Sequence, residues 1–307
     1  MAQAWQTPEG DDSSRSLRAG KSDKGESAEK LPVGLYVVAT PIGHARDITL
    51  RALDVLRGVD LIAAEDTRVT AKLLAIYDIR KPVVAYNDHN APEARPHLLK
   101  KLQAGLRIAQ VSDAGMPLVS DPGFKLVREA LAEGIPVESV PGVSASLTAL
   151  TLSGLPSDRF LFVGFLPTKA GERLHALNEL KPVRATLIFF ESPQRLGGTL
   201  AAMAEAFGSR AAAIGRELTK LHQEVRRGFL DDLARDYAEA PPKGEITLVV
   251  APPAEAVADY GKVEKALQTA LPFMPLKTAV NLVAEMLNAP RREVYARALK
   301  LKNDGQD

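Results

Sequence analysis

Val111–Gly123 reads VSDAGMPLVSDPG and follows a short apolar run that has the composition of a strand. The segment holds two Asp, two Gly, two Pro and two Ser, which is typical of a loop, and a helical pattern begins after it at Phe124. In an α/β protein, the loop that leaves the carboxyl end of a strand is where ligands are held. The segment therefore predicts a ligand loop, and the simpler alternative is a tight strand-to-helix turn.

Strands and helices alternate on both sides of this loop. In the first half of the chain, the pattern predicts strands at 35–39, 61–64, 83–85, 107–111 and 137–140, and helices at 49–58, 67–77, 91–104, 124–133 and 144–152. Strands that alternate with helices of 10–15 residues imply βαβ units. We therefore expect a mostly parallel sheet in this half.

The second half has a different pattern. After a linker at Ser153–Asp158, we predict strands at 160–164, 186–190, 211–216 and 245–251, and helices at 172–180 and 194–207. This favours a mixed α+β domain, with residues 228–237 open to either a strand or a helix.

The last part of the chain, beyond Pro253, has the pattern of three short helices at 260–271, 276–287 and 291–301. A break at Asn288–Pro290 separates the last two, which is the layout of a helix-turn-helix; the alternative is a small helical cap. The expected division is a disordered tail (1–30), two α/β domains (31–154 and 155–252) and a helical segment (253–307).

Composition narrows the class of protein. The 307 residues are 46% apolar and 25% charged, with a net charge of +1, which fits a globular protein of two domains. No apolar run approaches the ~20 residues that span a bilayer, and residues 1–30 lack the apolar core of a signal peptide, so we expect a cytoplasmic protein without a membrane segment. The chain has no Cys and no pair of His at metal-ligand spacing, so we expect no disulfide and no metal.

Two basic clusters, at 210–227 and 291–302, are candidates for contact with nucleic acid, although a solvated face is the simpler interpretation of each.

Three further loops resemble the first in composition and position. They occupy 39–47, 64–68 and 140–146, each after a predicted strand, and in a parallel sheet all four would meet at one edge. Gly115 and Gly142 would let the backbone approach a ligand, and Asp113 and Asp121 would accept hydrogen bonds from it. The chain has none of the nucleotide-binding glycine motifs, which favours a small polar ligand rather than a nucleoside triphosphate.

Six motifs together resemble the tetrapyrrole-methylase superfamily. They are TPIGHARDIT, AEDTR, SDAGMPLVSDPG, VPGVSA, FFESPQR and RELTKLHQEV, and they are most similar to the branch that methylates small-subunit ribosomal RNA. The resemblance implies two α/β domains with S-adenosylmethionine in the cleft between them, a small C-terminal helix-turn-helix-like domain, and a homodimer. It also implies transfer of a methyl group to the 2′-hydroxyl of a cytidine in the decoding region of 16S rRNA. The competing interpretations are methylation of a tetrapyrrole and a non-catalytic nucleic-acid-binding protein.

The resemblance also assigns residues. The cofactor pocket would comprise Pro41, Ile42, Asp113, Ala114, Gly115, Val119, Ser120, Ser144 and Ala145, with Phe190, Leu218 and Gly244 from the second domain. Met116 stands where the resemblance leads us to expect Thr, so we assign no side-chain role to this position.

Roles in catalysis and RNA binding are hypotheses. Asp66 or Glu191 would be the general base, and Arg68 would orient the substrate; the alternative role of Asp66 is to cap the following helix. The RNA contacts would come from Arg195, Arg216, Lys220 and Arg226, and from the terminal helices.

Overall fold

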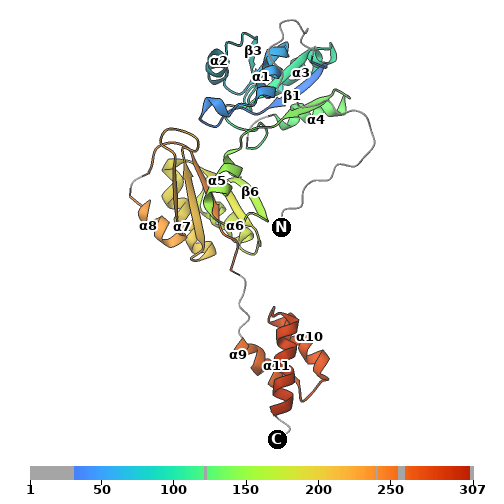
Figure 1. Ribbon diagram of the computed structural model, residues 1–307, viewed down its shortest axis with the longest axis vertical. Helices are drawn as coiled ribbons and strands as arrows, with labels where there is room; N and C mark the ends of the chain where they lie inside the picture. The colour runs from blue at the N-terminus through green and yellow to red at the C-terminus, as the bar shows by residue number, and fades with distance from the viewer. Residues whose placement is uncertain (1–30, 121–122, 240, 255–259, 305–307) are drawn as a thin grey trace, which may run out of the picture.

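The computed structural model describes residues 31–120, 123–239, 241–254 and 260–304. In this part of the chain two five-stranded sheets form separate α/β units, and three helices at the carboxyl end form a third unit, which lies apart from them in Figure 1. The predicted tail at 1–30 and Asp121 lie outside the described residues. Among the described residues, no helix is long and apolar enough to cross a membrane.

The first unit is the predicted parallel sheet. Its strands are β1 (Gly34–Val38), β2 (Leu61–Ala64), β3 (Val83–Ala85), β4 (Arg107–Val111) and β5 (Val137–Val140), in the order β3-β2-β4-β1-β5 with every neighbour parallel. Its helices are α1 (Leu50–Gly58), α2 (Thr67–Ile76), α3 (Ala91–Gln103) and α4 (Phe124–Ala132), with a single turn, η1, at Ala45–Asp47. These bounds agree with the predicted elements to within a residue or two.

Apolar side chains cover both faces of this sheet. Leu56 of α1 and Leu74 of α2 pack on one face, whereas Leu98 of α3 and Leu126 of α4 pack on the other. The strands are therefore buried on both sides, as the near-continuous apolar run of β2 indicates. Because helices cover both faces of the sheet, a ligand can reach it only at the loops at the strand ends.

The second unit is a mixed sheet. Its elements are α5 (Ala145–Ser153), β6 (Phe160–Phe165), α6 (Ala170–Leu180), β7 (Thr186–Glu191), η2 (Pro193–Arg195), α7 (Leu196–Phe207), β8 (Ala211–Arg216), β9 (Glu224–Phe229), α8 (Leu230–Asp236) and β10 (Ile246–Val250). The order is β6-β7-β10-β8-β9, parallel between β6 and β7 and antiparallel elsewhere. Residues 228–237, for which the sequence allowed a strand or a helix, contain both: β9 ends at Phe229 and α8 begins at Leu230.

Helix α5 corrects the expected domain boundary. From the sequence we expect this helix in the first domain, at residues 31–154. Its buried residues Ala149 and Leu150 instead pack with Ile188 of β7 and Val249 of β10, while α6, α7 and α8 supply the core on the other face. The boundary in packing therefore lies before α5, since the apolar surface of that helix completes the second sheet.

The third unit has a core of its own. Helices α9 (Tyr260–Ala270), α10 (Leu276–Met286) and α11 (Arg291–Asp304) bury Val263, Leu267, Val280 and Val294 against one another. Asn288, in the left-handed conformation at φ 46°, makes the tight turn between α10 and α11. The predicted three-helix layout is confirmed.

Candidate active site

The four predicted ligand loops follow β1, β2, β4 and β5, which are all parallel, so they meet at one edge of the first sheet. Thr40 and Gly115 tie two of them together, because the amide of each donates to the carbonyl of the other at 2.9 and 3.0 Å. Gly115 adopts φ 88°, a conformation that side chains disfavour. A Cβ at Gly142 would lie 2.8 Å from that of Ala39, so this loop also needs glycine for a close approach.

Two turns of the second unit face these loops. Glu217 (φ 49°), Thr219 (φ 64°) and Gly244 (φ 100°) all adopt left-handed backbone conformations. The Glu217 carboxylate connects the two turns. Its Oε1 accepts hydrogen bonds from the backbone amide of Glu245 and from the ammonium of Lys220, each at 2.9 Å. The amide of His44 in the first unit donates to Oγ1 of Thr219 at 3.1 Å, so the two units contact each other here.

A cavity of about 370 Å³ lies between the two units and is called the larger cavity below. It is lined by Ile42, Ala114, Ser120, Ala145, Phe165, Phe190, Glu191, Ser192, Pro193, Gly244, Glu245, Ile246 and Thr247. Six of these were assigned to the cofactor from the sequence, namely Ile42, Ala114, Ser120, Ala145, Phe190 and Gly244. The structure therefore brings together residues from three of the loops and from the second unit.

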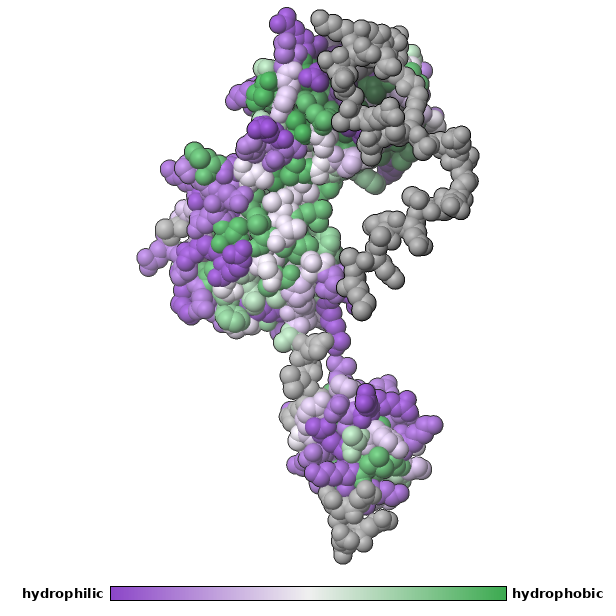
Figure 2. Space-filling model, viewed as in Figure 1, coloured by the Kyte–Doolittle hydropathy of each residue, from purple (hydrophilic) through white to green (hydrophobic). Residues whose placement is uncertain are grey.

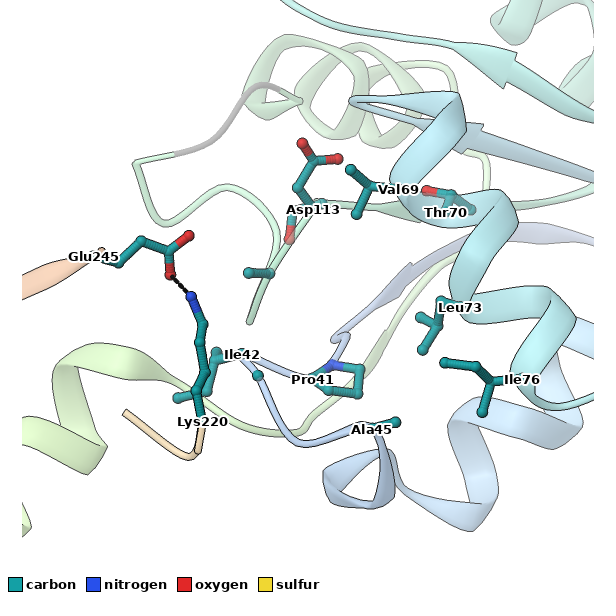
Figure 3. Close-up of a pocket in the computed structure, with 13 residues that line it drawn as sticks. Pro41, Ile42, Ala45, Val69, Thr70, Leu73, Ile76, Asp113, Lys220 and Glu245 are labelled. Carbon is teal, nitrogen blue, oxygen red and sulfur yellow. Dashed lines mark hydrogen bonds and ion pairs between the residues drawn. The ribbon is translucent and has the colours of Figure 1, made fainter. Parts of the chain in front are cut away.

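A smaller cavity of about 270 Å³ adjoins it (Figure 3). Its lining is Pro41, Ile42, Gly43, Ala45, Val69, Thr70, Leu73, Ile76, Ser112, Asp113, Ala114, Lys220 and Glu245. Ile42, Ala114 and Glu245 line both cavities, so the two spaces meet at these residues. Pro41 and Asp113, which were expected to hold the cofactor, lie on the smaller cavity.

Four expected cofactor residues are not among the residues that line either cavity. Gly115 forms the backbone bridge to Thr40, and Leu218 is buried in the core beside Ile42. The Ser144 hydroxyl is hydrogen-bonded to that of Ser146 at 2.9 Å, and Val119 is 36% exposed. The expected cofactor residues thus divide into some that line the cavities and some that lie beside them, and their part in cofactor binding stays a prediction.

The charges in the two cavities differ. Among the described residues that line the larger cavity, two are carboxylates, Glu191 and Glu245, and none is Lys or Arg. The smaller cavity has Asp113, Glu245 and Lys220. Burial raises the pKa of Asp113 above its usual value. Burial also acts to lower the pKa of Lys220, but its hydrogen bonds to the two glutamates outweigh that effect and raise the pKa, so Lys220 is a cation at neutral pH.

Asp66 acts as the cap of α2. Its side chain accepts the backbone amide of Arg68 at 2.8 Å and pairs with the Arg68 guanidinium at 2.5 Å. The hydrogen bonds from Arg68 lower the pKa of Asp66 to about 2. A base works best when its pKa is near the working pH, so these contacts favour the capping role that the sequence left open. Neither residue is among those that line the cavities.

Glu191 lies on the larger cavity, but both of its oxygens are engaged. Oε1 accepts the amide of Ser192 at 2.8 Å, and Oε2 accepts the hydroxyl of Thr199 at 2.6 Å. The Arg195 guanidinium lies 3.3 Å away, and only 1% of the Glu191 side chain is exposed. These contacts anchor the turn after β7.

The four cations that were expected to bind RNA all have partners within the chain. Arg195 donates to the carbonyl of Leu166 at 2.8 Å. Arg216 pairs with Glu224 at 3.0 Å, Arg226 with Asp236 at 2.8 Å, and Lys220 with Glu217 and Glu245. Of the four, only Lys220 is among the residues that line the two cavities described above. Their role in RNA binding stays a prediction.

Sequence reasoning missed Glu245 and Phe165 as site residues. Both were read only as parts of predicted strands or their flanks, since nothing local marks them. The preceding residue, Gly244, is the signal that could have pointed to Glu245. A glycine next to a predicted strand indicates a turn whose backbone lies close to another group. Phe165 reaches the larger cavity because the end of β6 lies beside Phe190, with ring centroids 5.7 Å apart.

Comparisons with known proteins agree with this architecture. The family of tetrapyrrole (corrin/porphyrin) methylases matches residues 34–234, and the RsmI C-terminal HTH domain matches residues 257–302. Ribosomal RNA small subunit methyltransferase I of Mesorhizobium japonicum is 53% identical over 279 residues, which is 90% of this chain and 95% of that protein. The protein of the same name from Erythrobacter litoralis is 49% identical over 276 residues, 90% of this chain and 98% of that protein.

Solved structures share the fold of the two α/β units. Uroporphyrin-III-C-methyltransferase from Thermus thermophilus is 25% identical with a TM-score of 0.53, and the match covers 74% of this chain and 97% of that one. A Thermus thermophilus uroporphyrin-III C-methyltransferase complexed with S-adenyl homocysteine is 21% identical with a TM-score of 0.52, over 70% and 96% of the two chains. Taken together, the family matches and these relatives show that the chain belongs to the ribosomal RNA small subunit methyltransferase I family, within the tetrapyrrole (corrin/porphyrin) methylases.

Proposed function

We propose that this chain transfers a methyl group from S-adenosylmethionine to the 2′-hydroxyl of a cytidine in the decoding region of small-subunit rRNA. The coarser part is an S-adenosylmethionine-dependent methyltransferase of small-subunit rRNA. It rests on relatives named ribosomal RNA small subunit methyltransferase I at 53% and 49% identity, and on the structural relative complexed with S-adenyl homocysteine. The observation that carries the proposal is the larger cavity, which is lined by residues of both α/β units where the predicted ligand loops meet the second unit. Its adjoining smaller cavity provides a second space for an acceptor.

The larger cavity fits the cofactor. Its volume of about 370 Å³ lies within the range of small-molecule sites, roughly 300–1,000 Å³. Phe165 and Phe190 offer aromatic surface, Gly244 offers backbone groups, and the exposed carboxylate of Glu245 suits a cationic sulfonium. When bound, the cofactor would supply an electrophilic methyl group. The chain itself would hold the acceptor oxygen in line and exclude water, which can provide a large part of the rate enhancement.

The identity of a general base stays a prediction. Asp66 and Glu191 were the candidates, but the contacts of both residues favour structural roles. We expect Asp66→Asn to keep the cap of α2 and near-normal turnover, whereas Glu191→Gln should lower turnover through the turn after β7. Turnover and S-adenosylmethionine affinity are measured for both variants. Lower turnover with unchanged affinity indicates a chemical role, whereas loss of both indicates a structural one. A loss of 10²-fold or more in Asp66→Asn alone would restore that residue as the base.

The third unit supports an RNA partner. Between residues 260 and 304 the chain has eight Lys or Arg against three Glu and one Asp, a net charge of +4, whereas the whole chain has +1. Glu264 and Glu293 both pair with Arg297, at 3.7 and 3.2 Å. The face of this unit seen in Figure 2 is largely hydrophilic. Such a surface suits the phosphate backbone, and we propose that it docks the rRNA. By similarity to the family we also propose a homodimer, and by its substrate a cytoplasmic location.

A transfer assay with labelled S-adenosylmethionine tests the proposed function. The acceptors are assembled small ribosomal subunits, naked small-subunit rRNA and a tetrapyrrole. We expect label in RNA and none in the tetrapyrrole. Label in the tetrapyrrole would favour the competing methyltransferase, and no label with any acceptor would favour a binding protein without catalysis.

A further inference from the structure

Helix α2 has two apolar faces. Leu74 is buried in the core of the first unit, whereas Val69, Leu73 and Ile76, at spacings of four and three residues, line the smaller cavity. Val69 is 39% exposed and Ile76 is 62% exposed, so packing within the chain does not account for this stripe. Exposed apolar side chains gathered in a cavity are typical of a ligand-binding wall.

The opposite wall is charged. In Figure 3, Lys220 and Glu245 lie across the cavity from the α2 stripe, joined by an ion pair of 3.1 Å. This ion pair comes from the second unit, and Glu245 also lines the larger cavity. A ligand in the smaller cavity would therefore have one end on an apolar surface and the other beside charged groups at the entrance to the cofactor space.

The cavity also has a hydrogen-bond acceptor at the start of α2. Oδ1 of Asp113 accepts the amide of Asp66 at 3.0 Å. A carboxylate has about four lone-pair positions, so Asp113 keeps the capacity to accept further hydrogen bonds. Carboxylates accept hydrogen bonds from the exocyclic amine of cytosine.

From this arrangement we propose that the smaller cavity receives the acceptor nucleoside, with its base against the stripe of Val69, Leu73 and Ile76 and its ribose towards Lys220 and Glu245. This inference rests on the proposed function and names the subsite for its substrate. A volume of about 270 Å³ suits a single nucleoside rather than a macrocycle. The target base must therefore leave its stack to enter, as in enzymes that extrude a nucleotide into a pocket.

The test compares two matched substitutions in the full-length protein. Ile76→Asp places a charge in the stripe, and Leu131→Asp places the same charge on α4 at a residue that is 59% exposed and not among those lining either cavity. Each variant is assayed for methyl transfer to small subunits and, by calorimetry, for S-adenosylmethionine affinity. We expect kcat/KM of Ile76→Asp to fall roughly 10- to 100-fold with cofactor affinity unchanged, and Leu131→Asp to behave as wild type.

The other outcomes are distinct. Normal transfer by Ile76→Asp would overturn the inference and leave the proposed function intact. Weaker cofactor binding by Ile76→Asp alone would also overturn it, because the smaller cavity would then be part of the cofactor site. If the wild type does not methylate RNA, the proposed function fails, and the nucleoside subsite fails with it.

Discussion

Glu217 shows how single residues set the geometry between the two α/β units. Its backbone is left-handed at φ 49°, and its carboxylate binds both the Glu245 amide and the Lys220 ammonium. The hydrogen bond from Lys220 is the main reason that the pKa of Glu217 is lowered. The Lys220–Glu245 wall of the smaller cavity therefore depends on a residue that itself lines neither cavity.

Gly43 is the matching residue of the first unit. A Cβ there would lie 2.8 Å from Oγ1 of Thr219 and 3.1 Å from the carbonyl oxygen of Leu218. We expect Gly43→Ala to lower the free energy of unfolding by about 1–3 kcal/mol and to weaken cofactor binding, because the loop must move away from the second unit. The control is Gly171→Ala in α6, where an added Cβ would have no atom within 4 Å apart from its neighbours and the backbone of its own helix. This substitution should raise the free energy of unfolding by roughly 0.5–1 kcal/mol. Urea titration and calorimetry check both, and an unaffected Gly43→Ala would contradict the close packing.

Asp113 gives a pH-dependent prediction. Burial raises its pKa above 3.8, although the hydrogen bond from the Asp66 amide acts in the opposite direction. The native state thus binds this proton more tightly than the unfolded state, and the ionised carboxylate destabilises the fold at neutral pH. Asp113→Asn should therefore be more stable than wild type at pH 7. The difference should shrink as the pH falls through the raised pKa and vanish below 3.8; urea titrations at pH 7 and 4.5 that show a constant or growing difference would contradict this.

At the scale of elements, the parallel sheet was predictable because its strands are short apolar runs between clear helices. Strand β9 (Glu224–Phe229) was missed because it lies at the edge of the second sheet and carries Arg226 and Arg227, so it lacks an apolar pattern. Helix α5 was found but assigned to the wrong domain, since its small apolar residues do not say which sheet they cover. The loops of the site follow from local composition, whereas Glu245 and the α2 stripe depend on how the two units meet.

The three-helix unit should be separable from cofactor binding. Its core lies among its own helices, and the residues that line both cavities belong to the α/β units. We expect deletion of residues 256–307 to weaken rRNA binding and to reduce its salt dependence, because cationic contacts to phosphate are lost, while S-adenosylmethionine affinity stays unchanged. Filter binding at several salt concentrations and calorimetry measure the two effects. An equal loss of both affinities would mean that the unit is a structural cap.

At the scale of the whole molecule, the function is divided among three parts. The loops of the first unit and the turns of the second enclose the larger cavity, which we propose for the methyl donor. The smaller cavity, between α2 and the Lys220–Glu245 pair, is proposed for the acceptor nucleoside, and the basic third unit for the rest of the rRNA. On this proposal, a fold shared with uroporphyrin-III-C-methyltransferase serves an RNA acceptor through the smaller cavity and the third unit.

The most direct test of the central claim is the chemical identity of the methylated product. Small subunits that lack the modification are incubated with the protein and S-adenosylmethionine, and their rRNA is digested to nucleosides and examined by mass spectrometry. We predict a single new product, 2′-O-methylcytidine, from the decoding region. A methyl group on a base, or no methylated nucleoside, would contradict the account.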